Sequence, residues 1–382
     1  MTKHKFIVTS NAGLEDITSQ EIEKINGRII NIFRARVFVE SDLNFVFRAN
    51  YLMRSAHKII LVLLEQKGVN SLDDAYTLVY NFPIEDFIGV DQTFAVRFER
   101  TGEHEFTSLD LNAKVGAAII DRFKSVKNQR IHVNLSEPEV EFIGWLNDDY
   151  FIFGINTSGE SLHKRRYRQA KHVAPLKSTI AYSLLQLSKW PENMEQILVD
   201  PMCGSGTILI EAAHLAKDIP PGFFREDYKY NSLRFLDFNY LDELKEEVNK
   251  KIQWNRKVPL YGVEINEKFY KGALENIKFA KVEDTIKIYN GDATKIRSIL
   301  NGEPEIMIVN PPYGIRLGVR LKVEKLYEKF MEEISKIDSL HRVVIMTADK
   351  TMEDIGKKYF ELKEKRTVLY GSFSTLIYTF TK

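Results

Sequence analysis

A glycine-rich turn holds the first residues whose pattern could bind a ligand. Residues 200–207 read Asp-Pro-Met-Cys-Gly-Ser-Gly-Thr and separate the apolar runs 197–199 and 208–213, which predicts a strand, a tight turn and a helix. Gly204 and Gly206 permit a positive φ, and Asp200 stands at the carboxyl end of the strand, where open α/β sheets bind ligands. The turn lacks the third glycine of a dinucleotide fingerprint and the Gly-Lys-Ser/Thr of a phosphate loop. A plain strand-to-helix turn is therefore the alternative.

Three further apolar runs each lead to a polar residue. Residues 260–264 end at Glu264, residues 286–290 are followed closely by Asp292, and residues 305–309 lead into Asn310-Pro-Pro-Tyr313. The carboxyl ends of parallel strands share one edge of a sheet. We therefore expect these side chains and the glycine turn to line a common cleft, and their combination is far more specific than any one part.

The polar residues of this cleft suit a nucleoside with a zwitterionic tail. Backbone N–H groups of the glycine turn, near a helix start, favour a carboxylate or a phosphate. Glu264 can accept hydrogen bonds from two ribose hydroxyls, Asp292 can accept from an exocyclic amine such as adenine N6, and Asp200 can face an α-amino group. The acids would repel a pyrophosphate, so the residues favour S-adenosylmethionine over a dinucleotide.

The Asn310–Tyr313 segment suits a planar substrate that carries an amino group. The side-chain oxygen of Asn310 and the carbonyl of Pro311 can accept from one NH2 group, while the prolines stiffen the loop and donate no competing N–H. Tyr313 can stack on the base. This pair need not act as a strong base, because it orients the nitrogen lone pair by pre-positioned geometry. A paired base has to be extruded to reach such a pocket.

The composition limits the other classes of function. The chain has 382 residues, enough for two or three domains, and its 44% hydrophobic and 28% charged residues are ordinary for a globular protein. No run approaches the roughly 18 apolar residues of a membrane helix, and the charged start leads into a short strand, so we expect a cytoplasmic protein with no membrane partner. The single Cys203 excludes an internal disulfide, and the eight histidines form no ligand-spaced cluster, so we expect no metal.

Residues 1–66 form the first of two predicted α+β units. A strand at 6–9 precedes a helix that Asn11 is expected to cap, and strands at 28–33 and 37–40, a helix over 45–53 and a strand at 59–64 follow. The alternative for this unit is a packing or dimerisation module.

The second unit, residues 67–157, resembles a THUMP domain. The resemblance rests on three stretches, residues 94–100, 101–108 and 115–119, within a pattern of helix 72–80, strand 93–99, helix 109–123 and three short strands. It implies an RNA partner and makes Arg97 and Arg100 candidate RNA contacts. The alternative is that both arginines simply face outward from a strand.

Residues 162–172 are the densest positive run and lie in a predicted linker, residues 158–174. Because the net charge is only +1, an RNA partner requires clustered positive charge. The run contains no acid and could neutralise phosphates while Tyr167 stacks on a base. The candidate RNA contacts here are Lys164, Arg165, Arg166, Arg168 and Lys171. The alternative is a solvated linker.

Strands and helices alternate through residues 175–382, which predicts a doubly wound parallel sheet. Strands are expected at 196–200, 260–264, 286–290, 305–309 and 342–347, with helices at 207–217, 267–280 and 321–336 between them. The runs 360–370 and 374–381 predict a terminal hairpin. An aromatic loop, residues 219–225, is expected near the cleft mouth.

Taken together, the chain resembles THUMP-containing class I methyltransferases that act on guanine N2 of RNA, and within them it is most similar to the archaeal-type tRNA enzymes, followed by the ribosomal RNA enzymes. The resemblance covers nearly the whole chain. It implies a Rossmann-like α/β catalytic domain after ferredoxin-like and THUMP domains, S-adenosylmethionine as cofactor, and N2-methylguanosine at position 6 of the tRNA acceptor stem as product. A 23S ribosomal RNA substrate is the alternative, and the protein is expected to be a monomer or weak dimer.

The resemblance also assigns site residues. Catalysis falls to Asn310, Pro311, Pro312 and Tyr313. Cofactor binding falls to Asp200, Met202, Cys203, Gly204, Ser205, Gly206, Thr207, Glu264, Asp292, Ala293 and Asn310. Position 310 holds Asn where many amino-methylating enzymes have Asp, which argues against general-base catalysis by this residue.

Other classes of protein fit the pattern less well. Asn-Pro-Pro-Tyr also occurs in enzymes that methylate adenine N6 or a protein glutamine, but a glutamine enzyme does not require an RNA-type N-terminal half. Methylation of cytosine C5 needs a cysteine nucleophile, and Cys203 lies in the cofactor turn. A non-catalytic RNA-binding factor is the alternative from another class, and it would fail to bind S-adenosylmethionine.

Overall fold

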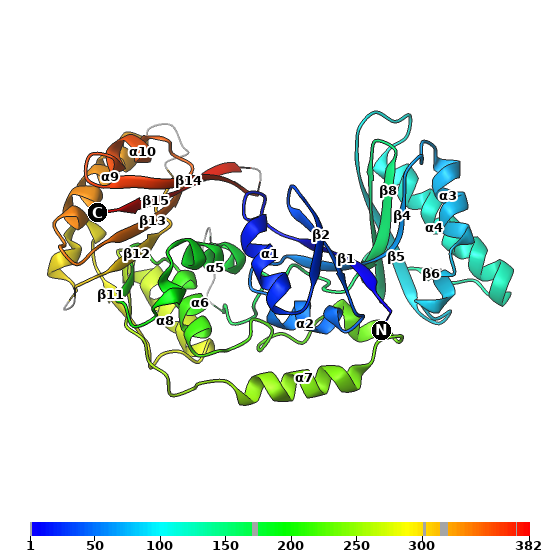
Figure 1. Cartoon of the computed structure of the whole chain (residues 1–382), viewed down its shortest axis with the longest axis horizontal. Coiled ribbons are helices and arrows are strands. Elements are labelled where there is room, and N and C mark those ends of the chain that lie inside the picture. Colours follow the sequence, from blue (N-terminus) through cyan, green and yellow to red (C-terminus); the bar gives the residue numbers. More distant parts are fainter. Residues whose placement is uncertain (1, 170–174, 301–302, 314–319, 372) are drawn as a thin grey trace.

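The computed structural model describes residues 2–169, 175–300, 303–313, 320–371 and 373–382. Two sheets, one in each half of the chain, organise the described residues (Figure 1). None of the described helices combines the length and apolarity needed to cross a membrane.

The N-terminal half is built on one eight-stranded sheet, in the order β2-β3-β1-β4-β8-β7-β5-β6. Its strands are β1 His4–Thr9, β2 Arg28–Phe33, β3 Arg36–Ser41, β4 Lys58–Gln66, β5 Thr93–Thr101, β6 His132–Val133, β7 Val140–Asn147 and β8 Tyr150–Asn156. Antiparallel pairing of β4 with β8, for example Ile60 with Asn156, joins the two predicted α+β units. The two units therefore share a continuous sheet.

Four helices accompany this sheet. They are α1 Glu15–Lys24, α2 Phe45–Leu52, α3 Leu72–Asn81 and α4 Ser108–Lys127. Helices α3 and α4 begin with capping boxes at Ser71 and Thr107, which satisfy N–H groups that a helix start leaves unpaired. The prediction that Asn11 caps α1 is wrong, because its N-cap residue is Leu14. The Asn11 side chain instead bonds to His57 at 2.9 Å and, across the domain boundary, to Thr179 at 3.3 Å.

The C-terminal half contains the predicted doubly wound sheet, in the order β11-β10-β9-β12-β13-β15-β14. Its strands are β9 Leu198–Asp200, β10 Leu260–Glu264, β11 Ile286–Asn290, β12 Ile306–Val309, β13 Arg342–Thr347, β14 Glu361–Tyr370 and β15 Phe373–Thr381. Strands β9 to β13 are parallel, and the terminal hairpin adds β15 antiparallel to β13. The helices are α5 Ser178–Leu187, α6 Thr207–Ala216, α7 Phe238–Lys250, α8 Glu267–Phe279, α9 Arg320–Ser335 and α10 Thr351–Gly356. The predicted fold class is confirmed.

The segment between α6 and β10 leaves the C-terminal half and returns. Figure 1 shows α7 running below the molecule, beneath the N-terminal half. Tyr230, Leu233 and Leu241 belong to the same hydrophobic core as the N-terminal sheet. The expectation that the loop 219–225 lies at the cleft mouth is wrong, because the N–H of Gly222 bonds to the carbonyl of Tyr51 at 3.1 Å and the loop packs between the two halves.

The two halves also meet along α1 and β14. Apolar side chains of α1 and the turn before it share a core with α5 and α6. The N–H of Leu369 bonds to the carbonyl of Ala12 at 3.1 Å, and one nitrogen of Arg366 contacts both carboxylate oxygens of Asp16 at 2.8 Å. Apolar, backbone and ionic contacts therefore hold the N-terminal half against the C-terminal half.

Candidate active site

A cavity of about 680 Å³ lies at the carboxyl ends of β9, β10 and β12. Its volume is in the range of small-molecule sites, which is roughly 300–1,000 Å³. Nearly all the residues predicted for cofactor binding and catalysis line it: Asp200, Met202, Cys203, Gly204, Ser205, Thr207, Glu264, Asp292, Ala293, Asn310, Pro311, Pro312 and Tyr313. Gly206 is outside the lining. The parallel strands thus bring four segments of the chain to one site.

The glycine turn takes the backbone shape that its sequence predicts. Gly204 and Gly206 have φ angles of +51° and +77°, which residues with a Cβ rarely adopt. The N–H of Gly206 bonds to the carbonyl of Cys203 at 2.8 Å, and the carbonyl of Gly206 accepts the N–H of Ile210 at 2.9 Å to start α6. The turn therefore passes directly from strand to helix at the cavity wall.

Glu264 links this turn to the next strand. One carboxylate oxygen accepts the N–H of Gly204 at 3.0 Å, and the other accepts the N–H of Asn266 at 2.8 Å. The side chain is buried, and each oxygen retains a further acceptor site for a ligand hydroxyl. Glu264 therefore fixes the local backbone as well as offering hydrogen-bond acceptors to the cavity.

Asp200 is buried at the end of β9, where it lines the cavity. Burial, with a smaller contribution from the negative charge of Glu264, raises the pKa of Asp200 to about 8, although its carboxylate accepts the N–H of Met202 at 3.2 Å. A cationic group placed beside these two acids would favour the ionised form of Asp200. The pair of acids therefore fits a positively charged ligand and disfavours an anion.

Asp292 and two apolar residues form another part of the cavity. One oxygen of Asp292 accepts the N–H and the hydroxyl of Thr294, both at 2.9 Å, and the other has no bond from the described residues. Ile265, which is 69% exposed, and Phe269 at the start of α8 add apolar surface suited to a planar ring. Neither residue was predicted from the sequence, although an apolar residue directly after Glu264 is a signal for a surface that packs on a ligand ring.

The Asn310–Tyr313 loop is held by two tyrosine hydroxyls. The hydroxyl of Tyr313 donates to the side-chain oxygen of Asn310 at 2.5 Å, and the hydroxyl of Tyr327 donates to the carbonyl of Pro312 at 2.7 Å. Burial raises the pKa of Tyr313, so its hydroxyl stays protonated and able to donate. The side-chain oxygen of Asn310 has a second acceptor site, which an incoming amine could use.

These features fit S-adenosylmethionine. The two acids Asp200 and Glu264 suit its positive charge and hydroxyls, the other Asp292 oxygen suits an exocyclic amine, and the apolar surface suits an adenine ring. The described residues contain no group of three or more His, Cys, Asp or Glu side chains arranged to hold a metal ion.

The basic run differs from its prediction at several positions. Arg165 is only 5% exposed, and its guanidinium donates to the carbonyls of Leu162 at 2.7 Å and of Arg54 at 2.5 Å. Tyr167 is 2% exposed and donates to Glu211 at 3.0 Å. The predictions that Arg165 contacts phosphate and that Tyr167 stacks on a base are therefore wrong, because both side chains are enclosed between the halves.

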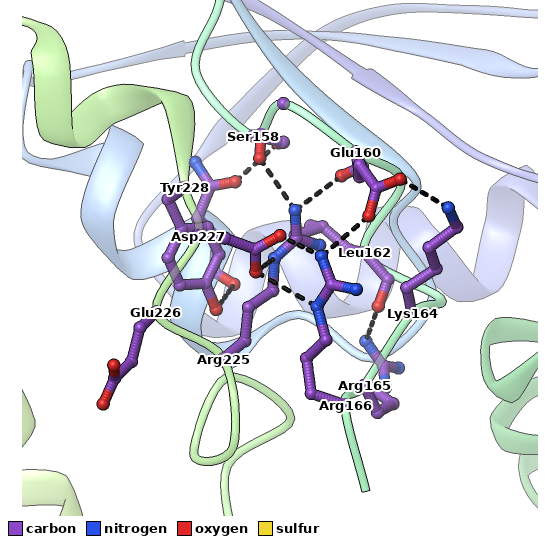
Figure 2. Close-up of polar contacts among 12 residues, drawn as sticks. Ser158, Glu160, Leu162, Lys164, Arg165, Arg166, Arg225, Glu226, Asp227 and Tyr228 are labelled. Carbon is purple, nitrogen blue, oxygen red and sulfur yellow. Dashed lines mark hydrogen bonds and ion pairs between the residues drawn. The ribbon is translucent and has the colours of Figure 1, made fainter. Parts of the chain in front are cut away.

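Neighbouring acids neutralise the exposed part of the same run. Figure 2 shows Arg166 between Glu160, at 2.7 Å, and Asp227. Lys164 pairs with Glu160 at 2.5 Å. Arg168 donates instead to the carbonyl of Leu176 and the hydroxyl of Thr207, both at 2.9 Å. RNA binding by Lys164, Arg166 and Arg168 stays a prediction, and Lys171 lies outside the described residues.

The two arginines of β5 also have partners. Arg97 is exposed and pairs with Glu141 at 2.7 Å, and Arg100 donates to the carbonyl of Gly102 at 3.1 Å and contacts His104 at 2.9 Å. Their role in RNA binding stays a prediction.

Family models cover most of the chain. Residues 5–60 match the RlmL ferredoxin-like domain, residues 69–156 match the THUMP domain, and residues 165–376 match the RMKL-like methyltransferase domain.

Relatives and a solved structure match most or all of this chain. The chain is 41% identical to a tRNA (guanine(6)-N2)-methyltransferase of Methanocaldococcus jannaschii, across 98% of this chain and 99% of that protein. It is 29% identical to the ribosomal RNA large subunit methyltransferase K/L of Pseudoalteromonas translucida, across 91% of this chain but 49% of that protein. A possible methylase from Clostridium difficile 630 has a TM-score of 0.90 and 26% identity, covering 100% of this chain and 98% of that one. The chain belongs to the RMKL-like methyltransferases that carry ferredoxin-like and THUMP domains.

Proposed function

We propose that this protein transfers a methyl group from S-adenosylmethionine to the exocyclic N2 of guanosine in tRNA, at position 6 of the acceptor stem. The observation that carries the proposal is the amine-accepting Asn310–Tyr313 loop, which lines the same cavity as the cofactor-type residues. The tRNA substrate and position 6 follow the full-length relative from Methanocaldococcus jannaschii. We place the protein in the cytoplasm with its tRNA, as a monomer or weak dimer.

Different residues of the cavity bind the cofactor and orient the guanine amine. Glu264 and Asp292 hold the hydroxyls and exocyclic amine of the cofactor, while Asp200 faces its amino group. S-adenosylmethionine supplies an electrophilic methyl group when it is bound. The side-chain oxygen of Asn310 and the carbonyl of Pro311 accept the two protons of the guanine amine and aim the nitrogen lone pair.

No strong base is needed in this scheme, because an alkylated amine loses a proton readily. Tyr313 stacks on the guanine, which has to leave the acceptor-stem helix to reach the cavity. The N-terminal half and the linker after it supply the RNA contacts, with Arg97 and Arg100 on β5 and Lys164, Arg166 and Arg168 in the linker as the described candidates.

The test is transfer of labelled methyl groups to unmodified tRNA and ribosomal RNA, followed by nucleoside analysis. N2-methylguanosine in tRNA, lost when guanosine 6 is replaced by adenosine, is expected. Label in ribosomal RNA alone would favour the second candidate, which the match to the Pseudoalteromonas translucida enzyme supports. Cofactor binding without label in either RNA would contradict both.

Asn310→Ala tests the role of the loop. We expect it to abolish transfer while the Kd for the cofactor changes little, since Asn310 orients the amine. Asn193→Ala is the control, because Asn193 is exposed and precedes β9 at the opposite edge of the sheet. Parallel loss of transfer and cofactor binding in Asn310→Ala would show structural damage instead of a catalytic role.

A further inference from the structure

A buried tyrosine of helix α9, Tyr327, holds the Asn310–Tyr313 loop by a hydrogen bond. Tyr327 lies on α9, is 0% exposed and shares a hydrophobic core with Val309, the last residue of β12. Its hydroxyl donates to the carbonyl of Pro312 at 2.7 Å. Because Tyr327 does not line the cavity, its contact with the loop acts through this carbonyl.

The hydroxyl belongs to a chain of hydrogen bonds with a defined direction. Tyr327 has one hydroxyl proton, which goes to Pro312, so the 2.9 Å contact with the hydroxyl of Thr347 must have Thr347 as donor. The oxygen of Thr347 in turn accepts the N–H of Asp349 at 3.0 Å. The chain therefore runs from the backbone after β13, through two side chains, to the loop.

This anchor determines where the neighbouring carbonyl points. The ring of Pro312 locks its φ angle, so ψ of Pro312 is the one soft torsion between the carbonyls of Pro311 and Pro312. Neither proline has an N–H that could fix the loop by another backbone bond. Holding the carbonyl of Pro312 therefore sets the direction of the carbonyl of Pro311, which is the proposed amine acceptor.

We propose that Tyr327 is a positioning residue for methyl transfer, which aims the carbonyl of Pro311 and, through the following peptide, the ring of Tyr313. The inference rests on the proposed function of this loop, and it assigns Tyr327 no contact with RNA or cofactor. Loss of its hydroxyl leaves the loop in place but lets ψ of Pro312 vary. The expected effect is therefore on the rate of transfer and not on binding.

The protein offers a matched control for this test, a second buried tyrosine. Tyr327→Phe removes only the hydroxyl. Tyr378→Phe removes the hydroxyl of another buried tyrosine in the same core, one that has no hydrogen-bond partner among the described residues. We expect kcat to fall by about tenfold to 100-fold in Tyr327→Phe, as when a buried acceptor loses its donor, and to stay within about twofold in Tyr378→Phe.

Binding measurements separate positioning from general damage. The Kd for S-adenosylhomocysteine and the KM for RNA should stay within about twofold of wild type in Tyr327→Phe. An unchanged kcat, an equal fall in Tyr378→Phe, or parallel loss of cofactor affinity would overturn the inference. Failure of the wild-type protein to form N2-methylguanosine would instead contradict the proposed function, and it is seen before any variant is compared.

Thr347→Val is a second variant that leaves the tyrosine ring and hydroxyl intact. It removes the donor to Tyr327 and the acceptor of the Asp349 N–H, while Tyr327 can still bond to Pro312, so we expect a fall in kcat smaller than in Tyr327→Phe. A larger fall would overturn the proposed order of the chain. This variant also keeps the inference testable if Tyr327→Phe does not fold.

Discussion

Replacing Glu264 by glutamine tests the cofactor side of the cavity. The two carboxylate oxygens of Glu264 accept the N–H groups of Gly204 and Asn266, at 3.0 and 2.8 Å. A glutamine has a single acceptor oxygen, so its NH2 group must face one of these N–H groups. The substitution therefore removes one charge-assisted bond and disturbs the backbone on one side of the cavity.

The size of the effect follows from that lost bond. A hydrogen bond to a charged group contributes roughly 1.5–3 kcal/mol. If the cofactor has to restore the wild-type backbone when it binds, the same free energy is lost from binding. Since about 1.4 kcal/mol corresponds to a tenfold change in Kd, we expect cofactor binding to weaken by roughly tenfold to 150-fold.

Calorimetry with S-adenosylhomocysteine measures this change directly. The control is Glu267→Gln, because Glu267 lies on the exposed surface of α8 and its carboxylate pairs with Lys271 at 2.7 Å in solvent. Such a solvent-exposed pair contributes little to stability, and we expect no effect on cofactor affinity. A Kd for Glu264→Gln within about twofold of wild type would refute the reasoning, since the carboxylate would then contribute nothing that an amide cannot.

Two further predictions concern buried charged groups. Burial raises the pKa of Asp200 from its ordinary 3.8 to about 8, so the folded chain binds more protons than the unfolded chain between about pH 4 and 8. The free energy of unfolding should therefore fall as pH rises through that window, and Asp200→Asn should reduce the fall in urea titrations; an equal slope in both proteins would contradict the assignment. Arg225 is 3% exposed and donates to the carbonyls of Ser158, Glu160 and Ser161 at 3.0, 2.9 and 3.2 Å. Arg225→Met should lower the free energy of unfolding by more than about 1 kcal/mol, because the buried carbonyl of Ser158 and the part-buried carbonyls of Glu160 and Ser161 lose their donor. Arg166→Met, on a side chain that is 40% exposed, should lower it by no more than about 1 kcal/mol, and equal losses in the two variants would show that burial is not the cause.

The cleft could be predicted because its signals are local. Each strand is a short apolar run, and the polar residue that ends or follows it is adjacent in sequence. Parallel pairing then brings Asp200, Glu264 and Asn310 to one edge of the sheet without any long-range information beyond strand order. The fold class followed from the same alternation of strands and helices.

The basic run could not be predicted in this way, because several partners of Arg165 and Arg166 are distant in sequence, and the nearby acid Glu160 lies just outside the run. Arg166 pairs with Asp227, which is 61 positions away, and Arg165 is enclosed by Arg54 and Glu211. The run itself contains no acid, so local charge counting indicates an exposed basic patch. The path of residues 228–250 was missed for the same reason, since α7 and the residues just before it find their apolar partners in the N-terminal half.

The buried contacts between the halves also bear on how RNA reaches the cavity. Glu211 lies on α6, directly after the glycine turn, and accepts from Tyr167 at 3.0 Å and from Arg165 at 3.4 Å. Arg54 approaches its other oxygen at 4.0 Å. Opening a hinge here would break these bonds and would also separate α1 from α5 and α6, which would expose apolar side chains of their shared core to water. Extruding one base costs only a few kcal/mol and is offset by stacking and hydrogen bonds in the cavity. Movement of the nucleotide, with the two halves held as one body, is therefore the less costly route to the active site.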